Sequence, residues 1–190
     1  MRIIILVAWA IVMVSIAGCA GNRETVLKAT AQTRHDIFQV VPSSQIVPGK
    51  ALLKIEFPIK TYKARLGGKY FKHNDPPYTA IVNIDGQTVE LTDEPVLEDL
   101  SGDFMKNPEV GTGWKYVFKK ILQLKPGSHR ITIAIPLSNI VTEKSINLKD
   151  GENILKIGPK YITPVSRYSR YPRFSHGLSG ITVQLNSQVL

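Results

Sequence analysis

The sequence predicts an all-β protein built as a single antiparallel β-sandwich, and three observations lead to this prediction. Short runs in which apolar and polar residues alternate recur after residue 50, which is the pattern of strands that bury one face. Glycine and proline lie between these runs, where turns are expected. Beyond the first 20 residues no helical pattern extends past one or two turns. Many short strands separated by turns are typical of a sandwich.

The first strands of the domain follow from this alternation and from one turn signal. Every second residue of 53–57 is apolar and the residues between them are charged, which predicts a strand with one buried face. Residues 78–91 contain two β-rich runs joined by Asp85-Gly86, a pair favoured in two-residue hairpin turns with positive φ angles. The sequence therefore predicts a β-hairpin over 78–91.

The later elements are read in the same way. Residues 114–124 begin with three aromatic residues in phase and continue with two leucines across Lys120, and such an interruption indicates a bulge or an edge strand. Residues 94–104 are the best candidate for a short helix. Alternating apolar residues predict two further strands, over 130–136 and 180–185.

Two stretches of the chain resemble each other, "LQLKPGSHRITI" from Leu122 and "INLKDGENILKI" from Ile146. Each is expected to form a strand, a tight turn and a strand, with Gly127 or Gly151 taking a positive φ angle. A spacing of 24 residues is too short for a repeated domain, so we interpret both as one turn chemistry used twice within one sheet architecture. The first stretch resembles the turn and strand of immunoglobulin-like modules in bacterial envelope proteins. This resemblance implies that the sandwich is immunoglobulin-like.

The start of the chain has the layout of a secretory leader. Residues 3–14 are apolar without interruption, Arg2 precedes them, and small residues lead to Cys19, the only cysteine. A membrane-spanning helix needs roughly 20 apolar residues, so a spanning segment is the weaker interpretation. The same residues would also be compatible with a plain signal peptide that contains a chance cysteine, or with an uncleaved anchor.

The segment Ile16-Ala17-Gly18-Cys19 resembles the lipobox of bacterial lipoproteins, with Ile16 at a position where leucine is commonest. The resemblance implies cleavage before Cys19, a diacylglycerol on its sulfur and a further fatty acyl chain, such as palmitate, on its new amino group. Several acyl chains give stable attachment to a membrane. Ala20 follows the cysteine in place of the aspartate that favours inner-membrane retention, which implies an exported protein anchored in the outer membrane.

The chain is long enough for one domain of ordinary size, and its 43% of hydrophobic residues can supply a core. We expect a cleaved signal peptide over 1–18, a lipidated cysteine and polar tether over 19–45, and a β-sandwich domain over 46–190. The tether is mostly small and polar. One apolar cluster at 37–41 leads from it to the first strand.

A formal net charge of +9 favours acidic partners such as anionic lipid or glycan. The most unusual segment is 167–174, where arginines alternate with aromatic residues. A guanidinium group binds carboxylate or phosphate and an aromatic ring offers an apolar face, whereas the alternative is a surface loop whose rings pack on the sandwich. Nucleic acid is not expected as a partner of an exported protein. The candidate binding residues are Arg167, Tyr168, Arg170, Tyr171, Arg173 and Phe174.

No motif for catalysis, metal or cofactor binding is found. The four histidines are scattered without metal-ligand spacing, and the acidic residues of 92–103 lack the spacing of a calcium loop. His176 and Ser179 lie close in sequence, but the Gly-x-Ser-x-Gly motif of a hydrolase is absent. We therefore expect a protein that is not an enzyme and that needs no cofactor.

Together these patterns favour a lipid-anchored protein of the bacterial cell envelope with a non-catalytic accessory or scaffold role. It would bind another envelope component through an exposed sheet edge or through the loop 167–174. The alternative is a module that binds a glycan or another envelope polymer through that same loop. An enzyme whose site is assembled from distant residues is the third hypothesis.

Overall fold

A computed structural model of the chain describes residues 26–27, 29–43, 45–62, 78–164 and 170–190. The predicted signal peptide and Cys19 lie outside the described residues, as do Arg167 and Tyr168. Among the described residues, no helix is long and apolar enough to cross a membrane.

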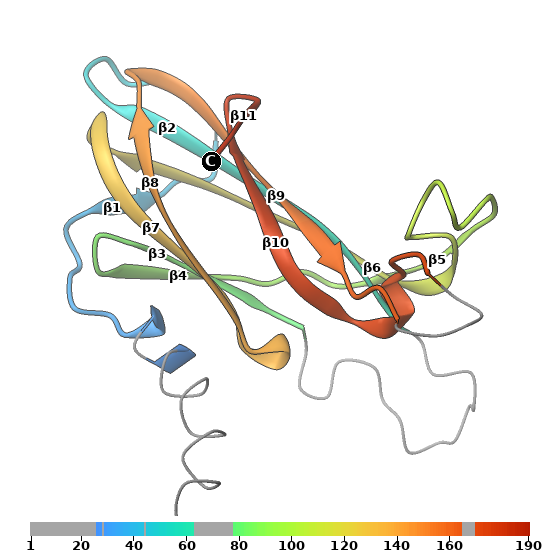
Figure 1. Cartoon of the computed structure of the whole chain (residues 1–190). Helices are drawn as coiled ribbons and strands as arrows, with labels where there is room; N and C mark the ends of the chain where they lie inside the picture. Colours follow the sequence, from blue (N-terminus) through green and yellow to red (C-terminus); the bar gives the residue numbers. More distant parts are fainter. Residues whose placement is uncertain (1–25, 28, 44, 63–77, 165–169) are drawn as a thin grey trace, which may run out of the picture.

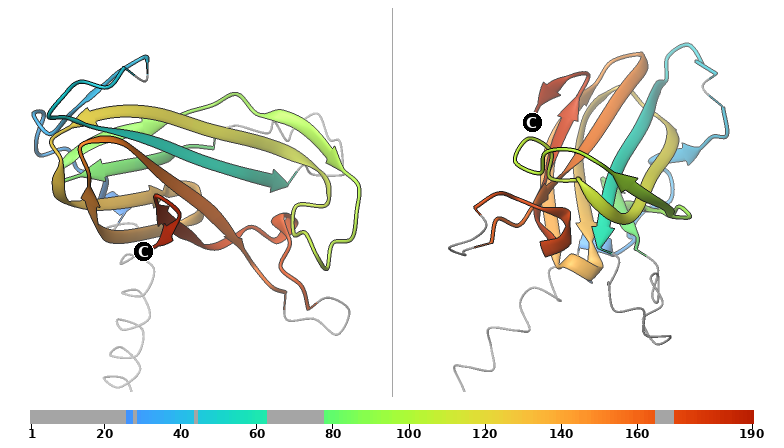
Figure 2. Two further views of the ribbon diagram at one scale, coloured as in Figure 1. Left: turned by 90° about the horizontal axis from the view of Figure 1, so that it is seen from above. Right: turned by 90° about the vertical axis from the view of Figure 1, so that its right-hand side faces the viewer.

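Two β-sheets pack face to face (Figure 1), and the end-on view in Figure 2 shows the two layers. The larger sheet has the order β1 (Phe38–Val40), β6 (Gly111–Leu124), β2 (Ala51–Tyr62), β9 (Gly151–Tyr161), β10 (Leu178–Leu185) and β11 (Gln188–Val189), with β5 (Val96–Leu100) also paired to β6. The smaller sheet has the order β4 (Gln87–Leu91), β3 (Ala80–Ile84), β7 (Gly127–Ile135) and β8 (Ile140–Leu148). Two short 3-10 turns follow β7 and precede β10, η1 (Pro136–Ser138) and η2 (Phe174–His176).

The core lies between the sheets and is built from the alternating apolar residues of the strands. Phe57, Tyr116 and Phe118 are fully buried, and their ring centroids lie 5.4 Å apart for Tyr116 and Phe118 and 5.8 Å apart for Phe57 and Phe118. Each large apolar side chain removed from water in this way stabilises the fold by about 1.5–3 kcal/mol. The predicted all-β sandwich of two sheets is confirmed.

The prediction that all strands are antiparallel is wrong for one pair. β2 and β9 run parallel, with Ala51 beside Gly151 and Glu56 beside Lys156. The chain passes through β7 and β8 of the smaller sheet before it forms β9, and β9 then begins at the end of the larger sheet where β2 also begins. A parallel pair of this kind depends on how the chain crosses between sheets, which no local pattern encodes.

The helix predicted over 94–104 is also wrong, because residues 96–100 form the strand β5 against residues 111–115 of β6. Pairing with a neighbouring strand outweighs a weak local pattern. The predicted bulge at Lys120 is absent, since β2 and β6 pair without a shift from Gly113 to Leu124. β6 is nevertheless a partial edge, because no described strand pairs with 116–121 on the side away from β2.

The hairpin predicted over 78–91 is confirmed, with positive φ angles of 48° at Asp85 and 95° at Gly86. The two similar stretches do share one turn chemistry, and Gly127 and Gly151 have φ angles of 121° and 84°. Each turn, however, connects the two sheets rather than two strands of one sheet: β6 leads to β7, and β8 leads back to β9.

The two connections are held by equivalent side chains. His129 Nε2 lies 2.8 Å from the carbonyl oxygen of Lys125, and Asn153 Nδ2 donates to the carbonyl oxygen of Lys149 over 2.8 Å. In each copy, a side chain four residues further along thus binds the lysine carbonyl of the turn. The side chain of Asn153 is fully buried, so in the second copy this bond is shielded from water.

The folded domain begins before the boundary predicted at residue 46. The N–H groups of Thr33 and Arg34 donate to the carbonyl oxygen of Gly86 over 2.8 and 3.1 Å, and β1 pairs with residues 122–124 of β6. Phe38 of β1 is buried in the core. The Asn83 amide of β3 also donates to the carbonyl oxygens of Ala29 and Ala31 over 3.2 and 3.1 Å. Residues 29–40 are therefore attached to the sandwich, and the stretch between Cys19 and Ala29 is about ten residues long.

Candidate functional site

The described part of the predicted binding segment lies between β9 and β10, at the end of the sandwich where β5 also lies (Figure 1). Phe174 is only 4% exposed, and its ring covers Gly111 and Gly113. A methyl group on Gly113 would lie 2.6 Å from that ring, so the ring packs directly on the backbone of β6. Phe174 therefore serves packing, in line with the alternative that the rings of this loop cover the sandwich.

Tyr171 and Arg173 remain at the surface, where both contact Phe104 of the loop between β5 and β6. The Arg173 guanidinium carbon lies 5.0 Å from the centre of the Phe104 ring, which is a cation–π contact. The Tyr171 ring meets Phe104 edge to face, with centroids 6.3 Å apart. With the neighbouring Met105, these side chains form what we call the aromatic cluster: Phe104, Met105, Tyr171 and Arg173.

Half of this cluster was not predicted. Phe104 and Met105 directly follow the acidic stretch, and the sequence pattern placed the first of them at the end of a helix. Their exposed fractions of 39% and 54% identify them as surface residues only once the fold is known. Arg170 is exposed but makes no contact with the cluster that the structure records.

A buried lysine lies beneath this end of the molecule. Lys60 belongs to β2, and its alternation places it on the outer face of the larger sheet, yet its side chain is fully buried. Its ammonium group has three oxygen neighbours: Glu98 Oε2 at 2.8 Å, the Glu109 carbonyl at 2.9 Å and the Gly111 carbonyl at 2.7 Å. The ammonium group thus donates hydrogen bonds to the two carbonyl oxygens and forms an ion pair with the Glu98 carboxylate. Lys60 is bound as a structural cation.

Tyr161 and Glu109 extend this arrangement to β9. The Tyr161 hydroxyl accepts a hydrogen bond from the Lys60 backbone N–H at 3.0 Å and donates to Glu109 Oε1 at 2.7 Å. Burial raises the pKa of Tyr161 well above its usual range, so the hydroxyl stays neutral and keeps the proton that it donates. The other oxygen of Glu109 is paired with Lys115 of β6.

These residues form the Lys60 network, which consists of Lys60, Glu98, Glu109, Lys115 and Tyr161. The network ties the loop that carries Phe104 and Met105 to strands β2, β6 and β9. A backbone bond from Phe174 N–H to the Pro108 carbonyl at 3.1 Å joins this loop to the segment that carries Tyr171 and Arg173. The Lys60 network and this backbone bond therefore hold both segments of the aromatic cluster, the one with Phe104 and Met105 and the one with Tyr171 and Arg173.

The other candidate groups of the sequence are engaged in local structure. Ser179 Oγ donates to the Lys160 carbonyl over 3.1 Å, and His176 lies beside Ser175 rather than Ser179. Asp93 accepts the Val117 N–H over 2.7 Å, and Asp99 accepts the Thr112 hydroxyl over 2.9 Å. Within the described part of the chain, no three His, Cys, Asp or Glu side chains lie close enough together to hold a metal ion.

Comparison of this chain with protein-family models, with curated proteins and with solved structures finds no match. The geometry of the end that carries the aromatic cluster is therefore the basis for a functional proposal.

Proposed function

We propose that this protein is a lipid-anchored component of the bacterial cell envelope, attached to the outer membrane through Cys19, with a non-catalytic accessory or scaffold role. It binds another envelope protein through the aromatic cluster. The observation that carries the proposal is that the exposed side chains of Phe104, Met105 and Tyr171 and the half-buried Arg173 lie next to the Lys60 network, which holds them in one arrangement.

The chemistry of the cluster favours a protein partner over an anionic polymer. Aromatic residues, methionine and arginine are the types enriched at the centre of protein interfaces. Arg173 is stacked on Phe104, and two more exposed apolar side chains, Val96 and Leu97, lie on β5 at the same end. A surface of this composition loses water at little cost when a protein covers it.

We include an immunoglobulin-like type of sandwich in the proposal, and the strand order supports it. In immunoglobulin variable domains, strands C′, C, F and G form one sheet, and strands B and E are neighbours in the other. Here the order β4-β3-β7-β8 and the adjacent pair β2 and β6 occupy equivalent places along the chain. β9 and β10 extend the second sheet beyond that common core.

The anchor and the aromatic cluster would lie at opposite ends of the domain. Residues 33 and 34 are bound at the β3–β4 turn, far from β5 and η2 in Figure 1. The stretch of about ten residues after Cys19 reaches at most ~36 Å, whereas β2 with its twelve residues spans about 40 Å. In this proposal the aromatic cluster therefore points away from the membrane that holds the anchor.

The lipid anchor is tested by Cys19→Ser in the full-length protein expressed in bacterial cells. We expect the precursor to remain uncut, because lipoprotein processing requires the modified cysteine, and intact-mass spectrometry to show no acyl groups. The unchanged chain, measured in parallel, should carry the acyl mass on Cys19. A Cys19→Ser protein that is still cut before residue 19 and still sediments with membranes would contradict the anchor.

The partner is tested by crosslinking in intact cells from a photoreactive residue placed at Tyr171. We expect a discrete protein adduct, and we expect Phe104→Ala to reduce its yield about ten-fold, since residues at the centre of an interface contribute 1–2 kcal/mol or more. The same photoreactive residue at Ser145, exposed on β8, should give no such adduct.

The other results of this experiment would count against the proposal. A smear of glycan or lipid adducts would instead favour the polymer-binding alternative for loop 167–174. The absence of any adduct would mean that the aromatic cluster is an ordinary solvated surface.

A further inference from the structure

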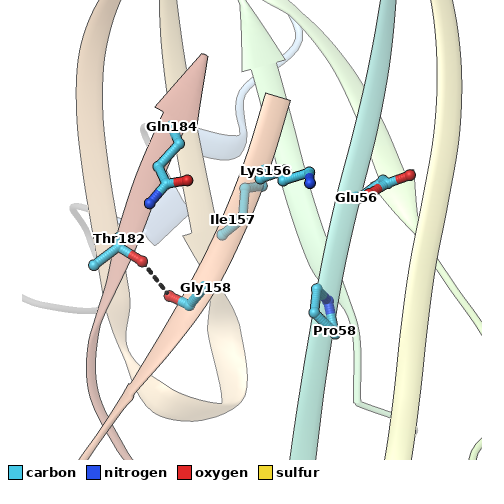
Figure 3. A pocket seen from close by; sticks show the side chains of 7 residues that line it. All are labelled: Glu56, Pro58, Lys156, Ile157, Gly158, Thr182 and Gln184. Carbon is cyan, nitrogen blue, oxygen red and sulfur yellow. Dashed lines mark hydrogen bonds between the residues drawn. The ribbon is translucent and has the colours of Figure 1, made fainter. Parts of the chain in front are cut away.

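β2 and β9 separate in the middle of the larger sheet. Their parallel pairing ends at Glu56 and Lys156, although β2 continues to Tyr62 and β9 to Tyr161. Figure 3 shows the two strands diverging beyond this point. This separation has no counterpart on the other side of β2, where pairing with β6 is continuous.

Two prolines account for the separation. The Lys60 N–H points toward β9, where it donates to the Tyr161 hydroxyl. The backbone N–H and C=O groups of the even-numbered residues of β2 therefore point toward β9. The Ile154 carbonyl points toward β10, where it accepts the Asn186 N–H. Because backbone groups alternate in direction along a strand, the N–H and C=O groups of the odd-numbered residues of β9 point toward β2. In this register the next two donors would be the N–H groups of residues 58 and 159, and both are prolines, which have none.

The missing donors leave two backbone acceptors at the separation. In a parallel ladder, residue 58 would donate to the carbonyl of Ile157, and residue 159 to that of Pro58. Neither carbonyl receives a donor from the facing strand. Backbone carbonyls of this kind accept hydrogen bonds from water or from a ligand, so a ligand that brings hydrogen-bond donors can bind there.

A hollow of about 300 Å³ opens on the outer face of the sheet at this separation. Gly158 forms part of its wall, and a methyl group at this position would lie 2.6 Å from Thr182 Oγ1. That hydroxyl donates to the Gly158 carbonyl at 3.2 Å (Figure 3). The side chain of Ile157 is buried, with only 1% of the residue exposed, so Ile157 lines the hollow with its backbone. The lining residues are Glu56, Pro58, Lys156, Ile157, Gly158, Thr182 and Gln184.

The charges around the hollow favour an anion. Lys156 lines it, Lys160 follows on the same face of β9, and Lys119 of β6 lies beside Glu56 in the register of β2 and β6. None of these three ammonium groups has an ion-pair partner among the residues that the structure describes. Glu56 is the one acid among the lining residues.

We propose that this hollow binds a saccharide unit that carries a carboxylate, as part of an acidic glycan. The ammonium group of Lys156 pairs with the carboxylate, and sugar hydroxyls donate to Glu56 and to the backbone carbonyls left by the two prolines. The Gln184 amide supplies a further polar contact, and the Pro58 ring offers an apolar surface to the C–H face of the sugar. This site is separate from the aromatic cluster and does not depend on the proposed protein partner.

The test is a titration of the full-length protein in detergent micelles with a tetrasaccharide of galacturonic acid, followed by NMR or calorimetry. We expect saturable binding with a Kd of about 1 mM or lower, and much weaker binding of a neutral glucose tetrasaccharide. Lys156→Met should weaken binding at least about ten-fold. Lys149→Met, which removes the same charge at the exposed turn before β9, should change the affinity less than about two-fold.

A second variant tests the separation of the strands without changing any charge. Pro58→Val restores an N–H that can donate to the Ile157 carbonyl, so we expect it to weaken binding of the acidic tetrasaccharide. Unchanged affinity in Pro58→Val would overturn the proposal, as would equal effects of Lys156→Met and Lys149→Met. Equal binding of the neutral sugar, or no saturable binding up to about 10 mM, would also overturn it.

Discussion

Replacing Lys60 by methionine is expected to lower the free energy of unfolding by about 3 kcal/mol, because two backbone carbonyl groups lose their donor and each such group costs about 1–3 kcal/mol. The side chain of Lys60 is fully buried, and its removal leaves the carbonyl oxygens of Glu109 and Gly111 without their donor. Denaturant unfolding followed by fluorescence measures the loss. The exposed Lys119→Met variant on the neighbouring strand should stay within about 0.5 kcal/mol of the unchanged protein.

The same variant connects stability to the proposed function. Lys60 does not belong to the aromatic cluster, but it holds the loop that carries Phe104 and Met105. We therefore expect Lys60→Met to reduce the Tyr171 crosslink under conditions where the protein is still folded. A variant with unchanged stability and an unchanged crosslink would show that the Lys60 network does not position the cluster.

The double variant Lys60→Met with Glu98→Gln separates two causes of the loss. If the cost arises mainly from leaving the Glu98 carboxylate without its cation, the neutral glutamine should recover part of the stability. If it arises from the carbonyl oxygens of Glu109 and Gly111, the double variant should be no more stable than Lys60→Met alone.

The second large effect is expected at Asn153, where alanine should cost about 3 kcal/mol, because each buried backbone group left without its partner costs about 1–3 kcal/mol. The Asn153 amide donates to the carbonyl oxygens of Lys149 and Gly151 over 2.8 and 3.1 Å and accepts the Lys149 N–H over 3.0 Å. Thermal or denaturant unfolding gives the difference directly.

The exposed Asn147 of β8 is the matched control, since Asn147→Ala removes the same side chain from the surface and should cost less than about 0.5 kcal/mol. Equal losses for the two alanine variants would mean that Asn153 does not hold the connection between β8 and β9. His129 at the equivalent place of the first connection also contacts Asp85, at 2.6 Å, so its contribution is shared with the β3–β4 turn.

Local chemistry was sufficient to predict several elements of the fold. The alternation in 53–57 was confirmed because a strand has a strict two-residue period, and burial of one face makes that period visible in the sequence. The Asp85-Gly86 turn was confirmed because few other residues accept positive φ angles. The glycines at 127 and 151 take positive φ angles for the same reason.

The candidate site was predicted only in part, because its contacts join segments that are far apart in the chain. Tyr171 and Arg173 were found by their unusual composition, but Phe104 meets them across about 70 residues. Lys60 occupies an ordinary polar position in an alternating strand. Lys60 is buried only because Glu98, the loop before β6 and Phe174 cover its side chain.

The sequence by itself determined that this chain forms a two-sheet β-sandwich with tight turns at defined glycines, because strand period and turn preference depend on neighbouring residues. Only the tertiary structure decided that residues 96–100 form a strand, that β2 and β9 run parallel, and that Pro58 and Pro159 face each other. The physical reason is that each of these features depends on which backbone groups meet across space. These long-range contacts are set by the packing of the whole chain.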